Sequence, residues 1–449
     1  MTALIRPETR ADLRELLNLA WPVVLARIGI MTMGLTDAVV VGRYAARELA
    51  LHSLAWAPTS VFLTTAVGLL MGVQVMTARL IGQGRRDEVG GVLRRGVVYS
   101  LQLGVAAMLA LVLAGPWALA RMGLEDGLGQ DAAPALVIFA VSLPFYLVSV
   151  ACQFFLEALS KPRPGMWAMW IANGLNIALN VWLVPGTSGL PVDGAAASSW
   201  ATFGARVALA AFLIVYIARL PEARALGVFR RPRKDPAAAR EQMKVGAGAG
   251  ASYFIEVGAF AAMSLVAGWL GGLQVAAWAI VINISAIVFM GPMGLSAATG
   301  VLVSRAFGAG DRAGVIRAVV LGLGVTAALT LMVALAVWPG ARLLAGAYTS
   351  EGALLALVVP ALILATLFFV ADGIQVVAAQ ALRSAADVWW PTVMHVFSYG
   401  VVMMPLGYVL AHPLGLGVNG IVLSVIIASL ISATLLSGRL VRVTRRMPG

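Results

Sequence analysis

The chain has 449 residues, of which 61% are hydrophobic and only 12% are charged, and its mean hydropathy is +0.92. Soluble domains carry about 25% charged residues, so this composition excludes a soluble globular protein. Repeated runs of about 20 apolar residues are long enough to cross a bilayer as helices. A single cysteine, Cys152, excludes an intramolecular disulfide framework. We therefore expect an all-α polytopic membrane protein.

The apolar runs predict twelve transmembrane helices. The longest polar break is 219-RLPEARALGVFRRPRKDPAAARE-241, which reads as a cytosolic linker. We expect an N-terminal lobe at 1–218, this linker at 219–242, and a C-terminal lobe at 243–449. The expected spans are 14–42, 52–82, 93–115, 133–158, 164–184, 194–218, 243–270, 274–304, 315–338, 352–382, 389–411 and 416–439.

The basic residues indicate the orientation of these spans. With the N-terminus placed inside, the inner segments hold 26 of the 32 Lys and Arg residues and the outer loops hold four. This asymmetry is the positive-inside pattern, and an even number of spans returns the C-terminus to the cytosolic side. The net charge of +12 is thereby explained by topology and by contact with anionic lipids. It does not call for a nucleic-acid partner.

The two halves of the chain resemble each other at three places in the same order. The segment 79-RLIGQG-84 matches 305-RAFGAG-310, 157-EAL-159 matches 380-QAL-382, and 192-VDG-194 matches 418-VNG-420. Each repeat holds six spans, so both repeats share one topology. This predicts two six-helix lobes related by a pseudo-twofold axis along the membrane normal.

Ionisable residues inside the spans are the candidates for function. A charge at the bilayer centre costs roughly 2.5–3.5 kcal/mol on insertion scales, so few positions should carry one without a reason. The spans hold four acids against two arginines, which favours a cationic cargo. We expect Glu157 to pair with Lys161 one turn later. The ionisable residues are Arg27, Asp37, Glu157, Arg206, Glu256, Asp372 and His395.

Asp37 lies in the apolar segment 34-GLTDAVVVG-42, where desolvation favours a neutral carboxyl group. Such an acid can load a proton on one side of a membrane and release it on the other. Asn173, Asn176 and Asn180 share one helix face, which should point to a cavity or to Asp37. We expect Asp37, Asn176 and Asn180 to form a substrate- or proton-binding site. The alternative is a structural, hydrogen-bonded aspartate near the outer interface.

Glu256 and Asp372 place two carboxylates in the second lobe, at depths well within the membrane. Two carboxylates in one lobe repel each other unless a proton or a cation lies between them. We therefore expect a monovalent cation site with these two acids as candidate Na⁺ ligands. The alternative is two separately hydrogen-bonded acids.

Several other residues carry weaker signals. Met33, Phe289, Phe368 and His395 are candidates for a cavity, although each one fits an ordinary packed position as well. Pro22 lies on the helix of Asp37 and is a candidate hinge.

The sequence resembles the multidrug and toxic compound extrusion (MATE) transporters over essentially its full length. The similar segments are 19–50, 68–84, 291–311 and 372–391, and the first and last are the most specific. Glu256 and Asp372 resemble the NorM-type branch, whose members carry a Glu on helix seven and an Asp on helix ten. Another branch carries an Asp where this chain has Asn180, so a two-acid proton site in the first lobe is in doubt. The resemblance implies two six-helix lobes around a central cavity.

We expect a secondary active antiporter that exchanges small organic cations for Na⁺ or H⁺ by alternating access, with no cofactor and no enzymatic activity. The chain lacks a phosphate-binding loop for ATP. The expected location is the bacterial inner membrane, as a multi-pass monomer in contact with lipid. The alternatives are a flippase of lipid-linked precursors from the same superfamily, or a passive channel or membrane scaffold. The sequence leaves the physiological substrate and the choice between Na⁺ and H⁺ open.

Overall fold

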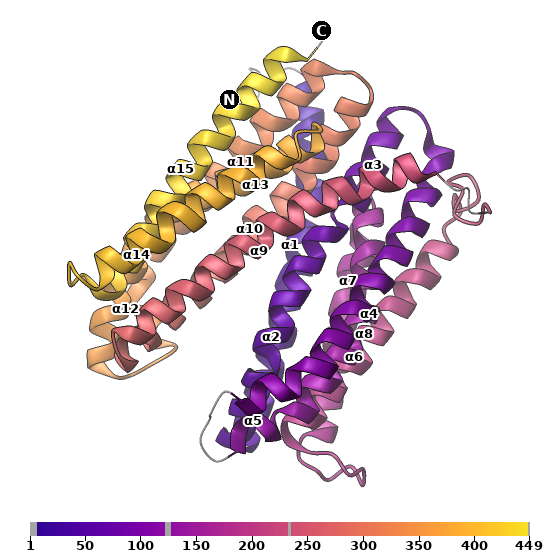
Figure 1. Ribbon diagram of the computed structural model, residues 1–449. Helices are drawn as coiled ribbons and strands as arrows, with labels where there is room; N and C mark the ends of the chain where they lie inside the picture. The colour runs from indigo at the N-terminus through magenta and orange to yellow at the C-terminus, as the bar shows by residue number, and fades with distance from the viewer. Residues whose placement is uncertain (1–6, 122–126, 232–234, 448–449) are drawn as a thin grey trace. The chain divides into compact units, whose positions relative to one another are not determined.

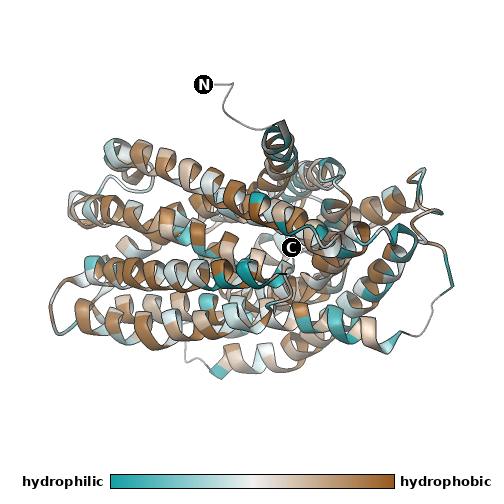
Figure 2. Ribbon diagram, turned by 90° about the horizontal axis from the view of Figure 1, so that it is seen from above, coloured by the Kyte–Doolittle hydropathy of each residue, from teal (hydrophilic) through white to brown (hydrophobic). Residues whose placement is uncertain are grey.

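The computed structural model describes residues 7–121, 127–231 and 235–447, which form helices and connecting turns without a β-strand (Figure 1). The helices are apolar along most of their length (Figure 2), as expected for segments that satisfy their backbone hydrogen bonds internally within lipid. The helices are α1 Pro7–Tyr44, α2 Ala46–Leu70, α3 Gly72–Gly82, η1 Arg86–Glu88, α4 Val89–Arg121, α5 Leu128–Asp131, α6 Ala133–Ala158, α7 Arg163–Leu183, α8 Gly194–Ala218, α9 Pro236–Trp269, α10 Gly272–Gly308, α11 Arg312–Gly346, α12 Gly352–Ser384, α13 Trp389–His395, η3 Val396–Met403, α14 Met404–Ala411 and α15 Gly417–Arg446.

Eleven helical runs among the described residues are long and apolar enough to cross a membrane. Helix α7 is the twelfth span, because its 21 residues give enough length and polar residues, chiefly its three asparagines, lower its mean hydropathy. Helix α2 continues into α3 across Met71, and α13 continues through the π-helix η3 into α14. The predicted all-α fold with twelve membrane spans is therefore confirmed.

Packing groups the chain into two compact units. Unit 1 comprises Met1–Val24 and Ala251–Gly449, and unit 2 comprises Leu25–Gly250. Helices α1 and α9 each contribute to both units, and the division of α1 falls two residues after Pro22. The expected lobes at 1–218 and 243–449 divide the chain by repeat rather than by packing, and that division stays a prediction.

Ion pairs tie the first turns of α1 to unit 1. Glu15 accepts a hydrogen bond from Arg305 of α10 at 2.9 Å, and Asp12 accepts one from Arg317 of α11 at 2.9 Å. These contacts explain why the beginning of α1 belongs with the C-terminal helices. The rest of α1 packs in unit 2, where Asn173 of α7 donates to the Gly29 carbonyl at 3.0 Å.

The ends of α6 and α12 show that the EAL/QAL match has the wrong register. Each helix ends at a non-glycine residue with a left-handed backbone, Ser160 with φ 60° and Ala386 with φ 67°. Their amides donate to the carbonyls of Glu157 and Arg383, respectively. Glu157 is therefore equivalent to Arg383 and not to Gln380, a shift of three residues. With this register, the residue of the first repeat that is equivalent to Asp372 is Tyr146. The EAL/QAL match would have given Ser149 instead.

The starts of α8 and α15 correct the VDG/VNG match in the same way. Gly194 has φ +52° and Gly417 has φ +55°, and a side-chain oxygen accepts a hydrogen bond from the next amide in both repeats. Glu48 accepts from Ala195 at 2.8 Å, and Gln274 accepts from Val418 at 2.9 Å. Short sequence matches found the repeat, but the helix caps fix its register.

The expected linker belongs to unit 2 and is partly buried there. Leu220, Ala223 and Leu226 are buried, and Arg94 of α4 donates to the carbonyls of Gly227 and Val228 at 2.7 and 2.9 Å. Helix α9 begins at Pro236, within the segment predicted to be linker. The segment lacks a long apolar run, so its packing depends on single residues that sequence patterns do not reveal.

A glycine on α9 allows close packing against α2 within unit 2. A Cβ atom at Gly246 would lie 1.9 Å from the Leu69 carbonyl oxygen, whereas a Cβ at Gly258 on the same helix meets nothing within 4 Å. We expect Gly246→Ala to destabilise the protein by roughly 1–3 kcal/mol through overpacking. Gly258→Ala should leave stability unchanged or raise it slightly. Unfolding of both variants in detergent tests this, and equal stabilities would contradict the packing.

Candidate functional site

Asp37 of α1 is buried in unit 2 and holds three hydrogen bonds. Its Oδ1 accepts from the Asn176 and Asn180 amides of α7 at 3.0 and 2.8 Å. Its Oδ2 accepts from the Thr202 hydroxyl of α8 at 2.6 Å. The structure therefore brings together the three predicted residues and adds Thr202. Asn173 takes no part, because its amide nitrogen donates to the backbone carbonyls of Gly29 and Met169.

A small cavity of about 50 Å³ lies beside Asp37, and Met33, Trp56, Tyr146 and Arg206 are among its lining residues. A water molecule needs roughly 10–15 Å³, so this cavity holds a few waters and excludes an organic cation of dye size. Arg206 donates to the Ser142 hydroxyl at 2.6 Å and lies over the Tyr146 ring at 5.0 Å. A fixed positive charge therefore faces the same cavity as the carboxylate.

Glu157 pairs with Arg27, and the expected pairing with Lys161 is wrong. Arg27 Nη2 lies 3.6 Å from Glu157 Oε1, and Gln74 donates to Glu157 Oε2 at 2.6 Å. Lys161 instead pairs with Glu222 of the segment after α8. Helical spacing suggested the local partner, but the buried acid takes a partner from α1, where water does not weaken the pair.

Glu256 of α9 and Asp372 of α12 meet at a single amide in unit 1. Gln375 Nε2 lies 3.3 Å from Asp372 Oδ1 and 3.5 Å from Glu256 Oε1. The Tyr399 hydroxyl lies 3.4 Å from Asp372 Oδ1. Hydrogen bonds to ionised carboxylates are usually 2.7–2.9 Å, so these contacts are long. The structure thus brings the two predicted acids together and leaves them weakly coordinated by protein donors.

Arg383, in the last turn of α12, and His395, at the end of α13, are almost fully buried in unit 1, at 1% and 2% exposed. The Nε and Nη2 atoms of Arg383, and both ring nitrogens of His395, have no hydrogen-bond partner among the described residues. The His395 ring packs edge-on against Tyr399 at 5.6 Å. Arg383 stands in the last turn of α12, so its burial is compatible with a place at the inner end of that helix.

The remaining candidates occupy different settings. Met33 is buried beside Asp37, at the small cavity. Phe368 belongs to the apolar core of unit 1 and packs edge-on against Phe369 at 5.3 Å. Phe289 is half-buried on α10. Pro22 lies inside α1, which continues through it as helix. Their proposed roles in a cavity or a hinge stay predictions.

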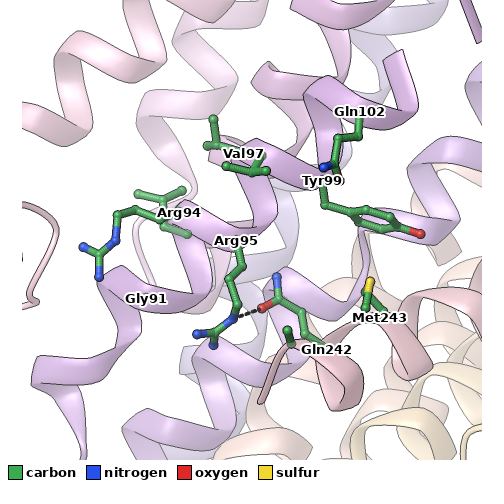
Figure 3. Close-up of a pocket in the computed structure, with 11 residues that line it drawn as sticks. Gly91, Arg94, Arg95, Val97, Tyr99, Gln102, Gln242 and Met243 are labelled. Atoms are coloured by element: carbon green, nitrogen blue, oxygen red, sulfur yellow. Dashed lines mark hydrogen bonds between the residues drawn. The ribbon is translucent and has the colours of Figure 1, made fainter. Parts of the chain in front are cut away.

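A groove of about 530 Å³ lies between α4 and the first turns of α9 in unit 2 (Figure 3). Arg94, Arg95 and Tyr99 line it from α4, and Gln242 and Met243 line it from α9. Arg95 Nε donates to Gln242 Oε1 at 3.2 Å. Two guanidinium groups repel a cation, so this larger groove is electrostatically unsuited to an organic cation.

Within the described part of the chain, neither unit shows a cluster of side chains typical of a tightly bound metal. The described residues contain no group of three or more His, Cys, Asp or Glu side chains that could hold one. The acid pair in unit 1 offers two carboxylates, the Tyr399 hydroxyl and the Gln375 Oε1 atom, which is buried without a partner. Hard oxygen donors of this kind suit a weakly held alkali cation or a proton rather than zinc or iron.

The fold and these buried sites define a class of membrane proteins with two six-helix repeats and ionisable clusters inside them. A family model described as MatE matches residues 22–182 and 249–409, and the chain belongs to this family. The family predicted from the sequence resemblance is confirmed.

Related proteins and structures agree with this assignment. The chain is 52% identical over 422 residues to a probable multidrug resistance protein NorM of Caulobacter vibrioides, covering 94% of this chain and 90% of that protein. It is 32% identical to the multidrug resistance protein NorM of Photobacterium profundum, covering 89% and 88%. The fold matches the eukaryotic MATE transporter AtDTX14 with a TM-score of 0.88 at 17% identity, covering 98% of both chains. An outward-facing multidrug resistance MATE family transporter matches with a TM-score of 0.88 at 19% identity, covering 96% of both chains.

Sequence reasoning missed three residues that contact the predicted acids. Thr202, Gln375 and Tyr399 are uncharged, so a search for ionisable residues within spans passes over them. Four arginines are buried, Arg27, Arg79, Arg206 and Arg383, against the buried acids Asp37, Glu157 and Asp372 and the half-buried Glu256. Acids therefore do not outnumber arginines among the buried side chains, and the charge count no longer favours a cationic cargo.

The assignment of Glu157 to Arg27 has a measurable consequence. Removing one partner of a buried pair leaves an uncompensated charge, so we expect Arg27→Met to cost about 3–5 kcal/mol of stability. Lys161→Met, which breaks a partly exposed pair next to the same helix end, should cost about 1 kcal/mol or less. The double variant Arg27→Met/Glu157→Gln should lose less stability than the single variants Arg27→Met and Glu157→Gln added together. Chemical unfolding in detergent measures all four; a larger loss for Lys161→Met than for Arg27→Met would contradict the pairing.

Proposed function

We propose that this protein is a multidrug efflux antiporter that expels organic cations in exchange for Na⁺ or H⁺ by alternating access. The relatives named as multidrug resistance proteins support the efflux activity. The weakly coordinated pair of Glu256 and Asp372 carries the assignment of ion coupling. Two acids that share one amide at 3.3 and 3.5 Å are stable together only when a cation or a proton reduces their repulsion.

The two units differ in how well their acids are satisfied, and this difference favours unit 1 as the coupling site. Asp37 accepts three hydrogen bonds of 2.6–3.0 Å, so its oxygens already have partners. Glu256 and Asp372 have contacts of 3.3–3.5 Å only. A bound Na⁺ would gain both carboxylates, the Tyr399 hydroxyl and the Gln375 carbonyl oxygen as ligands. A proton shared by the acids would relieve the same repulsion.

Asp37 is proposed to take part in substrate or proton binding, and its surroundings favour the proton. The cavity beside it is about 50 Å³, and Arg206 lines that cavity. A cationic cargo would need more room and would meet this arginine. A proton needs no such room. Bound to Asp37, it would weaken the hydrogen bonds that the carboxylate accepts from Asn176, Asn180 and Thr202. Protonation of Asp37 would thereby loosen α1 from α7 and α8.

The chain is a multi-pass membrane protein, and its curated relatives above are bacterial proteins. The distribution of Lys and Arg supports a location in the bacterial inner membrane with both termini in the cytosol. Small organic cations and membrane lipids are the proposed partners, without a cofactor and without enzymatic activity.

The coupling prediction is tested with purified protein in liposomes loaded with ethidium. We expect either a Na⁺ gradient or a pH gradient alone to drive efflux, which names the coupling ion. Neutralisation in Glu256→Gln/Asp372→Asn should abolish the gradient-driven part, because neither a Na⁺ nor an exchangeable proton is then required. Glu351→Gln, which removes an exposed acid just before α12, is the matched control and should transport like wild type.

Two results would contradict the proposal that Glu256 and Asp372 couple ion entry to efflux. If neither gradient moves ethidium, the efflux proposal fails, and flipping of a labelled lipid-linked precursor becomes the test of the flippase alternative. If the acid-pair variant transports like wild type, the protein is a passive channel or the coupling site lies elsewhere.

A further inference from the structure

The groove between α4 and the first turns of α9 has no role in the transport proposal. It belongs to unit 2, and its volume of about 530 Å³ is within the 300–1,000 Å³ of pockets that hold small molecules. Its lining on α4 runs from Gly91 to Gln102, which is roughly 16 Å along the helix axis. The end near Gly91 is basic, and most of the other lining residues are apolar. These apolar residues are Leu93, Val97, Val98, Ala239 and Met243.

The two arginines at the basic end converge on one point beside Gly91 (Figure 3). A Cβ atom built on Gly91 would lie 3.5 Å from Nη1 of Arg95 and 3.9 Å from Nη2 of Arg94. The two nitrogens are therefore no further apart than the sum of these distances, 7.4 Å. A phosphate group can bridge donors at such a distance, because it accepts a hydrogen bond of 2.7–2.9 Å on each of two oxygens.

The charges of these two arginines are not neutralised by direct contact. Arg94 donates to two backbone carbonyls through Nη1, and Arg95 donates to the uncharged Gln242 amide through Nε. No carboxylate of the described residues forms an ion pair with either guanidinium group. The acids on neighbouring segments have other partners: Glu88 pairs with Arg85, Asp87 with Arg230 and Glu241 with Arg79, and Asp235 accepts from the Ala238 amide. Glu88 and Asp235 attract Arg95 electrostatically without contacting it.

The second repeat has no arginines at the equivalent place. The close contact of α4 with α3 at Gly96 recurs between α11 and α10 at Gly322, 226 positions later. By this offset, Val320 and Leu321 stand where α4 carries its two arginines. The shared backbone frame is therefore satisfied by apolar residues here, and the arginines of the first repeat call for a different reason.

The setting of the groove suggests what that reason is. The proposed orientation places the beginning of α4, directly after 85-RRDE-88, on the cytosolic side. The cytosolic leaflet carries anionic lipids, and basic pockets between transmembrane helices on that side bind their headgroups. Val98 and Met243 line the same groove and are 54% and 43% exposed. A basic end next to exposed apolar side chains is complementary to a headgroup followed by an acyl chain.

We propose that this groove binds one anionic phospholipid of the cytosolic leaflet. The headgroup phosphate lies between Arg94 and Arg95, and an acyl chain follows Val97, Val98 and Met243. The lipid thereby links α4 to the first turns of α9, beside the hydrogen bond from Arg95 to Gln242. The inference goes beyond the proposed function, because it needs the orientation of the chain but neither the acid pair nor a coupling ion.

The site is tested by lipid binding to the purified, delipidated protein in detergent. Phosphatidylglycerol, phosphatidylcholine and inorganic phosphate are the probes, and native mass spectrometry measures the occupancy of the first bound lipid. We expect phosphatidylglycerol to bind tighter than phosphatidylcholine by roughly tenfold, because its headgroup carries a net negative charge. Inorganic phosphate at the same concentration should leave phosphatidylglycerol bound, since it lacks the acyl chain.

Two double variants separate the groove from general surface charge. Arg94→Gln/Arg95→Gln should weaken phosphatidylglycerol binding by about thirtyfold, because each basic residue contributes roughly fivefold to the attraction of an anionic lipid. Arg240→Gln/Lys244→Gln is the matched control. It removes the same charge from exposed residues in the first turns of α9 that do not line the groove, and it should bind nearly like wild type.

Three results would overturn the inference. Equal binding of phosphatidylglycerol and phosphatidylcholine would show that the groove does not select an anionic lipid. Displacement of phosphatidylglycerol by inorganic phosphate would indicate a site for a soluble anion. Equal losses in the two double variants would show a diffuse charge effect.

A single variant keeps the inference testable if the double variant does not fold, since Arg94 also holds the carbonyls of Gly227 and Val228. Arg95→Gln alone should weaken phosphatidylglycerol binding by about fivefold, and an unchanged affinity would overturn the inference. None of these results bears on gradient-driven ethidium efflux, which tests the proposed function separately.

Discussion

Charge buried among apolar helices is the constraint on which the rest of this structure depends. In a region with few water molecules, each ionised side chain needs a partner from another helix or a mobile ion. Unit 2 meets this need internally, through the pair of Arg27 and Glu157 and through the three hydrogen bonds to Asp37. In unit 1 the contacts are longer, because Glu256 and Asp372 share the Gln375 amide at 3.5 and 3.3 Å. On the proposed function, this weaker coordination is what suits unit 1 to bind and release an ion.

The internal repeat explains how one architecture produces two different sites. The caps at the ends of α6 and α12, and those at the starts of α8 and α15, have the same geometry in both halves. The backbone frame is therefore common, while the side chains at equivalent places differ. Glu157 is replaced by Arg383, Arg27 by Tyr253 and Tyr146 by Asp372. These three exchanges leave the summed charge unchanged, because the first adds two positive charges and the other two each remove one, but they move the acid from the end of α6 to the middle of α12.

The proposed mechanism follows from this asymmetry. A cation bound at the acid pair lowers the repulsion within unit 1, and its departure restores that repulsion. Asp37 is held by donors from α7 and α8, so its protonation would change how firmly α1 is attached to unit 2. Helix α1 belongs to both units, with its division just after Pro22. A change in its attachment is therefore a change at the place where the chain passes from one unit to the other.

The sequence by itself determined the fold class, the number of spans and the family, and it singled out Asp37, Asn176, Asn180, Glu256 and Asp372. Composition, apolar run length and helical spacing are local properties, and lipid leaves a helical span little choice of structure. Only the tertiary structure decided which buried charged side chains pair with each other. Glu157 lay one turn from Lys161 in sequence, yet Arg27 of another helix is its partner. Arg383 stands in the last turn of α12, yet the packing of other helices leaves its side chain only 1% exposed. Such pairings depend on which helix faces meet and on the absence of water between them, and neither property is written in the local sequence.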